Sequence, residues 1–167
     1  EWKALSGGQI DVIEPATGQV LAQVALANAQ DVQASALLAR QAQKTWAAMP
    51  YGERAKIFRK AADLLEANRQ AFATWIVRET GGIIPKAMFE IDSVVHHCHE
   101  AAAMLTQSRG LVLPSVDGVT SLARRVPHGV VGVISPFNFP FLLSSRAVLP
   151  ALATGNAVVL KPDARTP

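Results

Sequence analysis

The feature that most restricts the fold is a strand–helix–strand pattern near the end of this 167-residue sequence. Residues 130–134 form an apolar, mostly β-branched run, which is typical of a strand buried on both faces. A proline-containing loop, an apolar helix over 141–153 and a second short strand over 157–160 follow. A helical connection predicts that the two strands are parallel, with a right-handed crossover. The fold class is therefore α/β, and we expect Pro150 to kink the helix or end it early.

A parallel sheet of only two strands is too small to be stable alone. The sequence stops at Pro167, shortly after the second strand and before another crossover helix. We therefore expect a truncated chain, which holds the first part of a larger α/β domain.

The upstream sequence is mostly helical in pattern. We predict a hairpin of strands 10–13 and 19–25 around a turn at 14–18. Four helices are predicted, over about 28–48, 53–66, 69–79 and 85–108. Residues 111–126 are strand-like, with a turn at 115–118. Asn28 is the predicted N-cap of the first helix, and Gly81 ends the third. The side chains expected to face the core are Val32, Ala36, Ala39 and Trp46 in the first helix and Ile57, Ala61, Leu64 and Leu65 in the second.

The composition excludes several classes of protein. Half of the residues are hydrophobic and 17% are charged, which excludes a disordered chain, and one cysteine cannot form an internal disulfide. The net charge is only +3 and basic residues alternate with acidic ones, so we expect no nucleic-acid partner. The apolar stretch between Arg125 and Lys161 is divided by prolines and asparagines, so we expect no membrane span and a cytoplasmic location.

A cluster of histidines with a cysteine lies in the fourth predicted helix. Neighbours on a helix diverge by about 100° each, so only His96, His99 and Glu100 share a face. Three such side chains without a partner motif are a weak indication of a metal site. We therefore expect helix packing here, and no metal. Cys98 stands in mid-helix, which is a poor place for a nucleophilic thiol.

The loop after the first parallel strand is the best candidate for chemistry. Ligands of α/β sheets bind at the carboxyl ends of the strands, where Asn138 and Lys161 both lie. The amide of Asn138 could donate to an oxyanion, and Lys161 could donate to a cofactor hydroxyl or phosphate. The alternatives are a turn asparagine and a surface lysine. The sequence contains no Gly-x-Gly-x-x-Gly, so the usual dinucleotide-binding motif is missing.

At these residues the chain resembles the aldehyde dehydrogenase superfamily. The matching segments are VPHGVVGVISPFNFP at 126–140 and LPALATGNAVVLKP at 149–162, and the regions 14–18 and 46–54 are also similar. The resemblance covers almost the whole chain, which would be the first third of such an enzyme. It implies the N-terminal part of a Rossmann-like cofactor-binding domain, with a helical and hairpin part at 1–108, a β excursion for oligomerisation at 109–127, and the start of the cofactor-binding core at 128–167.

The resemblance also implies a mechanism and a set of site residues. A cysteine thiolate attacks the aldehyde, and Asn138 is the catalytic residue that holds the oxyanion while hydride passes to NAD or NADP. The residues implied to line the cofactor are Ile134, Ser135, Pro136, Phe137, Asn138, Lys161, Pro162 and Asp163, and those toward the substrate are Phe139, Leu143 and Arg146. The nucleophile and the general base would lie beyond Pro167, so the isolated chain is predicted to be inactive. The implied partners are a small-molecule aldehyde and further copies of the full-length chain.

Two departures from the family pattern refine this prediction. Many members carry a glutamate that holds the ribose hydroxyls of the cofactor. Here Ala164 occupies that position. We therefore expect weaker discrimination between NAD and NADP, unless the Asp163 carboxylate takes over the role of the glutamate. Arg146 stands where an aromatic residue often lines the substrate funnel, and with residues 78–81 it resembles the benzaldehyde-type branch. The alternative for Arg146 is a salt bridge on the helix surface.

Two other functions remain open from the sequence. One is a CoA-acylating or other reductase on the same scaffold. The other is a non-catalytic module that binds a nucleotide or a partner.

Overall fold

The computed structural model describes residues 5–167. Its helices are α1 (Ala29–Ala48), α2 (Tyr51–Ala67), α3 (Arg69–Thr80), α4 (Ile84–Met104) and α5 (Pro140–Ala153). Its strands are β1 (Gln9–Ile13), β2 (Val20–Ala25), β3 (Gly110–Leu113), β4 (Ser121–Arg124), β5 (Val130–Ile134) and β6 (Ala157–Lys161). No helix in this range is long and apolar enough to cross a lipid bilayer.

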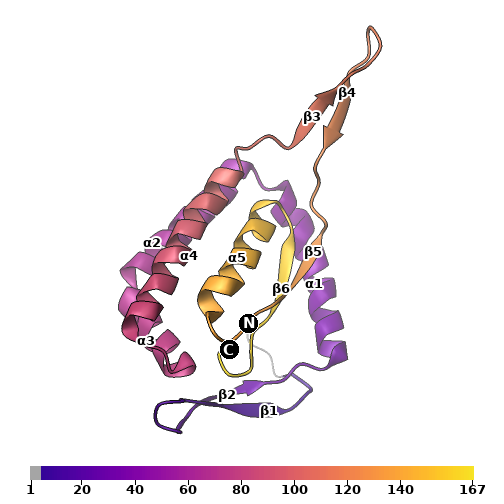
Figure 1. Ribbon diagram of the computed structural model, residues 1–167. Helices are drawn as coiled ribbons and strands as arrows, with labels where there is room; N and C mark the ends of the chain where they lie inside the picture. The colour runs from indigo at the N-terminus through magenta and orange to yellow at the C-terminus, as the bar shows by residue number, and fades with distance from the viewer. Residues whose placement is uncertain (1–4) are drawn as a thin grey trace.

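The predicted strand–helix–strand unit is confirmed. β5 and β6 are parallel, and their register pairs Val130 with Ala157 and Ile134 with Lys161. α5 covers one face of this pair, and α1 lies along the other (Figure 1). Because the two strands end at the same level, the segments that follow them emerge side by side.

The core lies between the helices on the far side of α5. α4 packs against α5 on one side and against α2 and α3 on the other (Figure 1). Along α4, Ala87, Ile91, Cys98 and Ala101 are at most 2% exposed. The small alanine side chains let the neighbouring helices approach closely, so α4 is a fixed support for α5.

Both predicted hairpins are present. β1 and β2 are antiparallel, and the turn between them is tied to α3 by an ion pair of 2.8 Å between Glu14 and Arg78. β3 and β4 are also antiparallel and project from the body as an arm (Figure 1). The apolar side chains of this arm are exposed, among them Leu111, Val112 and Leu122.

The predicted helix caps are also present. The Asn28 side chain accepts hydrogen bonds from the N–H groups of Gln30 and Asp31, and Gly81 ends α3 with a φ of 67°. Only glycine adopts this left-handed conformation without strain.

Two predictions about the strand–helix–strand unit and α4 were wrong, and a third, on Pro150, was wrong in one of its two alternatives. β5 is not buried on both faces, since Val133 is buried but Ile134 is 82% exposed, because β5 pairs only with β6 in the described chain. For Pro150 the sequence predicted a kink or an early end of the helix, and the early end does not occur. α5 continues to Ala153, because proline removes one hydrogen bond while the next turn keeps the bond from Thr154 N–H to Pro150 O. α4 ends at Met104, four residues earlier than predicted.

The predicted buried face of α2 was wrong in part. Leu65 is buried and Ala61 packs against the core as predicted, but Ile57 and Leu64 are exposed. The buried residues are Arg54, Ala55, Phe58, Ala62 and Leu65. The true face is displaced by one residue around the helix because Arg54 buries its whole side chain there. In α1, Val32 is exposed, whereas Ala36, Ala39 and Trp46 are half-buried as expected.

Candidate active-site loop

The carboxyl ends of β5 and β6 bring together the two segments in which the sequence placed the site. Residues 135–139 follow β5 and residues 162–167 follow β6. The pairing of the strands continues one residue further, because the Ser135 N–H donates to Lys161 O at 3.0 Å. The residues predicted to line a cofactor therefore lie on two neighbouring strand ends, with Ile134 and Lys161 both exposed.

Ser135 fixes the start of the loop. Its side chain is buried, and its hydroxyl lies 2.5 Å from the hydroxyl of Ser144 in the first turns of α5. Ser144 in turn donates to Pro140 O at 2.5 Å. The Ser135 hydroxyl and N–H are thus both used inside the protein, so Ser135 anchors the loop at the end of β5.

Asn138 lies at the tip of this loop and is exposed. Its side-chain amide makes no hydrogen bond to any other residue between 5 and 167, so both of its N–H groups are available to a ligand. A turn asparagine would spend its side chain on nearby backbone, as Asn28 and Asn68 do. The geometry therefore favours a donor of hydrogen bonds at the loop tip.

The loop ends at Phe139, which is held from α4. The Lys86 Nζ lies 4.7 Å from the centroid of the Phe139 ring, and the Phe89 ring meets it edge-on at 6.4 Å. Glu90 of the same helix accepts from the backbone N–H groups of Phe141 and Leu142 at the start of α5. Sequence reasoning missed Lys86 and Glu90, although their i, i+4 spacing in an apolar helix was a usable signal.

The segment after β6 carries a second ion pair. Arg165 donates to the Asp163 carboxylate at 2.8 and 3.2 Å, and its guanidinium lies 3.6 Å from the centroid of the Phe137 ring. These hydrogen bonds lower the pKa of Asp163 to about 2. Arg165 was not among the predicted site residues, and the Asp-x-Arg spacing is the signal that could have indicated it.

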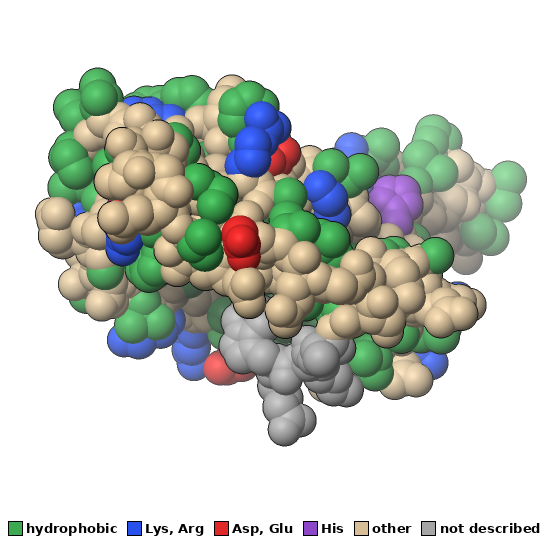
Figure 2. Space-filling view, turned by 90° about the horizontal axis from the view of Figure 1, so that it is seen from below, with side chains coloured by type: hydrophobic (Ala, Val, Ile, Leu, Met, Phe, Trp, Pro, Cys, Tyr) green, Lys and Arg blue, Asp and Glu red, His purple; other side chains and the backbone are tan. Residues whose placement is uncertain are grey.

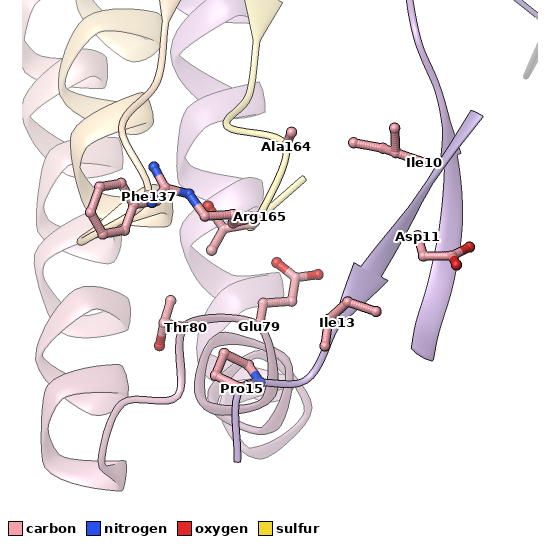
Figure 3. Close-up of a pocket in the computed structure, with 10 residues that line it drawn as sticks. Ile10, Asp11, Ile13, Pro15, Glu79, Thr80, Phe137, Ala164 and Arg165 are labelled. Carbon is pink, nitrogen blue, oxygen red and sulfur yellow. The ribbon is translucent and has the colours of Figure 1, made fainter. Parts of the chain in front are cut away.

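A cavity of about 490 Å³ lies between this segment and the β1–β2 hairpin (Figure 3). Phe137 and Arg165 form one side of it, and Ile10, Ile13 and Pro15 form the other. The Glu79 carboxylate points into it from the end of α3, and burial raises the pKa of that group (Figure 3). The cavity therefore lies between the segments that follow β5 and β6 and the N-terminal hairpin.

The residues predicted to face a substrate lie in α5 or directly before it. Leu143 and Arg146 are three residues apart in α5, which places them on one face of that helix, and Phe139 immediately precedes the helix. Arg146 is exposed, and it makes no salt bridge within residues 5–167, so the surface-pair alternative has no partner there. Beside it, the Nδ1 of His97 lies 3.5 Å from the Ser145 hydroxyl. The pKa of His97 is lowered, mainly by burial and to a smaller extent by the positive charge of Arg146.

The other histidines of α4 do not converge. His96 and Glu100 are both exposed and lie 3.6 Å apart. No three His, Cys, Asp or Glu side chains between residues 5 and 167 form a group that could hold a metal.

Cys98 is 2% exposed in the helical core, and burial raises the pKa of its thiol. The thiolate is the reactive form, so a raised pKa leaves less of it at pH 8 than a free cysteine has. We expect iodoacetamide to label Cys98 at least about tenfold more slowly than a small thiol until the protein is unfolded. Peptide mapping by mass spectrometry measures this rate. Labelling of folded protein at the rate of a free thiol would contradict the buried position.

The face of the molecule shown in Figure 2 is not strongly basic. Figure 2 shows Lys and Arg side chains scattered among hydrophobic and polar ones on the face that it presents, rather than gathered in a stripe.

Comparisons with known proteins cover nearly the whole chain. The family model described as "Aldehyde dehydrogenase family" matches residues 2–167. The chain is 51% identical over 165 residues to a vanillin dehydrogenase of Amycolatopsis sp. and 47% identical over 166 residues to a benzaldehyde dehydrogenase [NAD(+)] of Pseudomonas putida, with 99% of the chain and 34% of the relative covered in each case. A crystal structure of an NAD-dependent benzaldehyde dehydrogenase from Corynebacterium glutamicum superimposes with a TM-score of 0.94 at 40% identity, over 99% of this chain and 37% of that one. The chain spans about a third of the length of the curated relatives it matches.

Proposed function

Because the chain belongs to the aldehyde dehydrogenase family, we propose that it supplies the first third of an enzyme that oxidises an aldehyde to a carboxylic acid with a nicotinamide cofactor. One observation carries this proposal. The free amide of Asn138 lies at the end of β5, beside the end of β6. An uncharged donor at such a place suits a negative charge that forms during a reaction.

In the proposed reaction, a cysteine thiolate from elsewhere in the full-length protein attacks the aldehyde carbon. The carbonyl oxygen becomes an oxyanion, and Asn138 donates a hydrogen bond to it from its side-chain N–H. When bound, the nicotinamide supplies an acceptor for the hydride that leaves this carbon. The product is a thioester, which water hydrolyses to the acid and the free thiol. The Asn138 amide stays uncharged in every step, so it gains or loses no proton during the reaction.

The residues at the two strand ends fit a dinucleotide. Ile134 offers an exposed apolar surface, Lys161 offers an exposed cation for a ribose hydroxyl or phosphate, and Pro162 and Asp163 continue the same edge. We assign Ile134 to Asn138 and Lys161 to Asp163 to the cofactor. Residues 128–167 then form the start of the cofactor-binding core, and residues 1–108 form its helical and hairpin support.

The charge beside Lys161 offers little repulsion to a cofactor that carries a 2′-phosphate. Ala164 has no carboxylate, and the Asp163 carboxylate is neutralised by its two hydrogen bonds to the Arg165 guanidinium. An unpaired carboxylate would repel the phosphate, and a paired one repels it much less. Asp163 is therefore a poor substitute for the ribose-binding glutamate of other members.

We expect weak discrimination between NAD and NADP. The preference for NAD, given by kcat/KM with NAD divided by kcat/KM with NADP in the full-length protein, should be below about 10³. Ala164→Glu should shift the ratio toward NAD because it restores repulsion of the phosphate. A larger ratio in the unchanged protein would reject this prediction.

The proposed substrate is an aromatic aldehyde of the benzaldehyde type. The vanillin and benzaldehyde dehydrogenases to which the chain is similar support this class. Arg146 supports it too, since a guanidinium that is not held in a salt bridge can stack on an aromatic ring. Phe139 and Leu143 are the proposed apolar neighbours of that ring.

Arg146→Ala should raise the KM for benzaldehyde several-fold and leave the KM for a short aliphatic aldehyde nearly unchanged. A cation–π contact is worth about 0.5–2 kcal/mol, which corresponds to this change. Steady-state kinetics with both aldehydes measures it. Equal changes for the two substrates would show that Arg146 does not contact the ring.

The β3–β4 arm is the proposed contact between copies of the full-length protein. It projects from the body (Figure 1). Its strands expose Leu111, Val112 and Leu122. An exposed apolar surface on a projecting hairpin is typical of a protein interface. Residues 109–127 are thus assigned to oligomerisation.

The activity itself is tested by the absorbance of the reduced cofactor at 340 nm. Purified full-length protein should reduce NAD or NADP when benzaldehyde or vanillin is added, and it should release the acid. No aldehyde-dependent reduction with either cofactor would overturn the proposed function.

A further inference from the structure

The start of α5 takes its cap from another helix. Phe139 precedes α5 and gives no side-chain hydrogen bond, and Pro140 has no N–H. The Oε2 of Glu90, on α4, accepts from the N–H groups of Phe141 and Leu142, both at 3.1 Å. A carboxylate is favoured there because the helix N-terminus carries unpaired N–H groups and the positive end of the dipole. Glu90 therefore links α4 directly to the turn that follows the loop.

Glu90 is completely buried, and Lys86 is its third partner. The Glu90 side chain is 0% exposed, and its Oε1 lies 2.5 Å from the Lys86 Nζ, whose side chain is 18% exposed. A buried carboxylate is stable only where hydrogen-bond donors and an opposite charge replace water. The two backbone amides and the ammonium group meet this need, so the loss of one partner disturbs the others.

The same pair also reaches the loop itself. The Lys86 Nζ lies 4.7 Å from the centroid of the Phe139 ring, and Phe139 directly follows Asn138. On the other side of Asn138, the Ser135 hydroxyl is tied to Ser144 in α5. The loop is thus held on both sides of Asn138, through Ser144 of α5 on one side and through the α4 residue Lys86 on the other.

We propose that the Lys86–Glu90 pair is a positioning device for the Asn138 amide. It holds the first turn of α5 and the ring of Phe139, and so determines where the loop tip points. This inference rests on the proposed function, because the donor role of Asn138 makes its position matter. Glu90 and Lys86 do not touch the reacting atoms. A displacement of about 1 Å caused by a change away from the chemistry can cost about 10² in rate.

The test is a double-mutant cycle in the full-length protein, with Glu90→Gln, Asn138→Ala and the double variant. Glutamine is uncharged, so it loses the attraction of Lys86 while it keeps the size of the side chain. Glu90→Gln should lower kcat about tenfold or more, with little change in the KM for the aldehyde. In the Asn138→Ala background, Glu90→Gln should cost less than about twofold, since the amide that it positions is gone.

The matched control is Glu100→Gln. Glu100 lies on the same helix, and it is exposed and paired with His96. This variant should leave kcat unchanged in both backgrounds. If Glu90→Gln does not fold, Lys86→Met takes its place in the cycle, and Lys86→Arg should restore most of kcat because it keeps a cation over the Phe139 ring.

The outcomes separate the two proposals. If Asn138→Ala cripples the enzyme and Glu90→Gln costs the same factor in both backgrounds, its effect does not pass through Asn138 and the positioning role is overturned. If Asn138→Ala itself retains the original kcat, the proposed function of the loop fails, and the positioning role fails with it.

Discussion

Replacement of Asn138 by alanine should lower the kcat of the full-length protein by about 10²–10³, which is the usual cost of removing one oxyanion donor. The amide is exposed at the loop tip and makes no hydrogen bond to another described residue, so its removal leaves no buried group without a partner. The loss should therefore appear in the reaction rather than in folding. The donor acts on charge that develops only in the transition state, so the KM for the aldehyde should change little.

Two further variants sharpen this result. Asn138→Asp has the same size but places a negative charge beside the oxyanion, so it should be at least as slow as the alanine variant. Asn68→Ala is the matched control, because the Asn68 amide donates to the Leu64 carbonyl at the end of α2, away from the loop. Its kcat should stay within about twofold of the original. A loss in Asn138→Ala no larger than that of the control would show that the amide does not stabilise the oxyanion.

Arg54→Ala should lower the free energy of unfolding by about 2–4 kcal/mol. The Arg54 side chain is 1% exposed, and its Nη1 donates to the carbonyls of Trp46 and Ala47 at 3.1 and 3.0 Å. These carbonyls end α1, where the helix dipole favours a cation. Alanine would leave the Ala47 carbonyl without this donor, would leave the Trp46 carbonyl with only the Met49 N–H at 3.3 Å, and would open a cavity beside Trp46. Because α1 covers one face of the β5–β6 pair, the damage should reach the sheet.

Denaturation by urea of the full-length protein, followed by tryptophan fluorescence, measures this effect. Arg54→Met keeps much of the volume but donates nothing, so it should recover only part of the stability. Lys56→Ala is the control, since Lys56 is on the same helix and its ion pair with Glu53 is largely exposed. Exposed pairs contribute little. Equal denaturation midpoints for Arg54→Ala and Lys56→Ala would refute the role assigned to Arg54.

The elements that the sequence predicted correctly are those with strong local signals. The β-branched run at 130–134 and the Thr-Gly-Asn stop before residue 157 define the β5–α5–β6 unit. Asn28 and Gly81 fix the ends of α1 and α3 through their own side chain or backbone freedom. These features depend on a few neighbouring residues, so they can be predicted without knowledge of the rest of the fold.

The features that the sequence did not predict depend on distant partners. The periodicity argument treated Arg54 as a polar surface residue, although its side chain is buried against the end of α1. The predicted face of α2 therefore left out Arg54 and included Ile57 and Leu64, which are exposed. The link between Glu90 and α5 joins residues about fifty positions apart, and its other end is backbone, which leaves no mark in the sequence. The strand-end position of Asn138 could be predicted, whereas its support by Glu90 required the packed structure.

The most direct test of the central claim is a crystal structure of the full-length protein with an aldehyde trapped as its adduct on the nucleophilic cysteine. The account predicts that the Asn138 Nδ2 lies about 2.7–3.1 Å from the oxygen of that adduct. An Asn138 side chain turned away from this oxygen, with another group as its donor, would contradict the account.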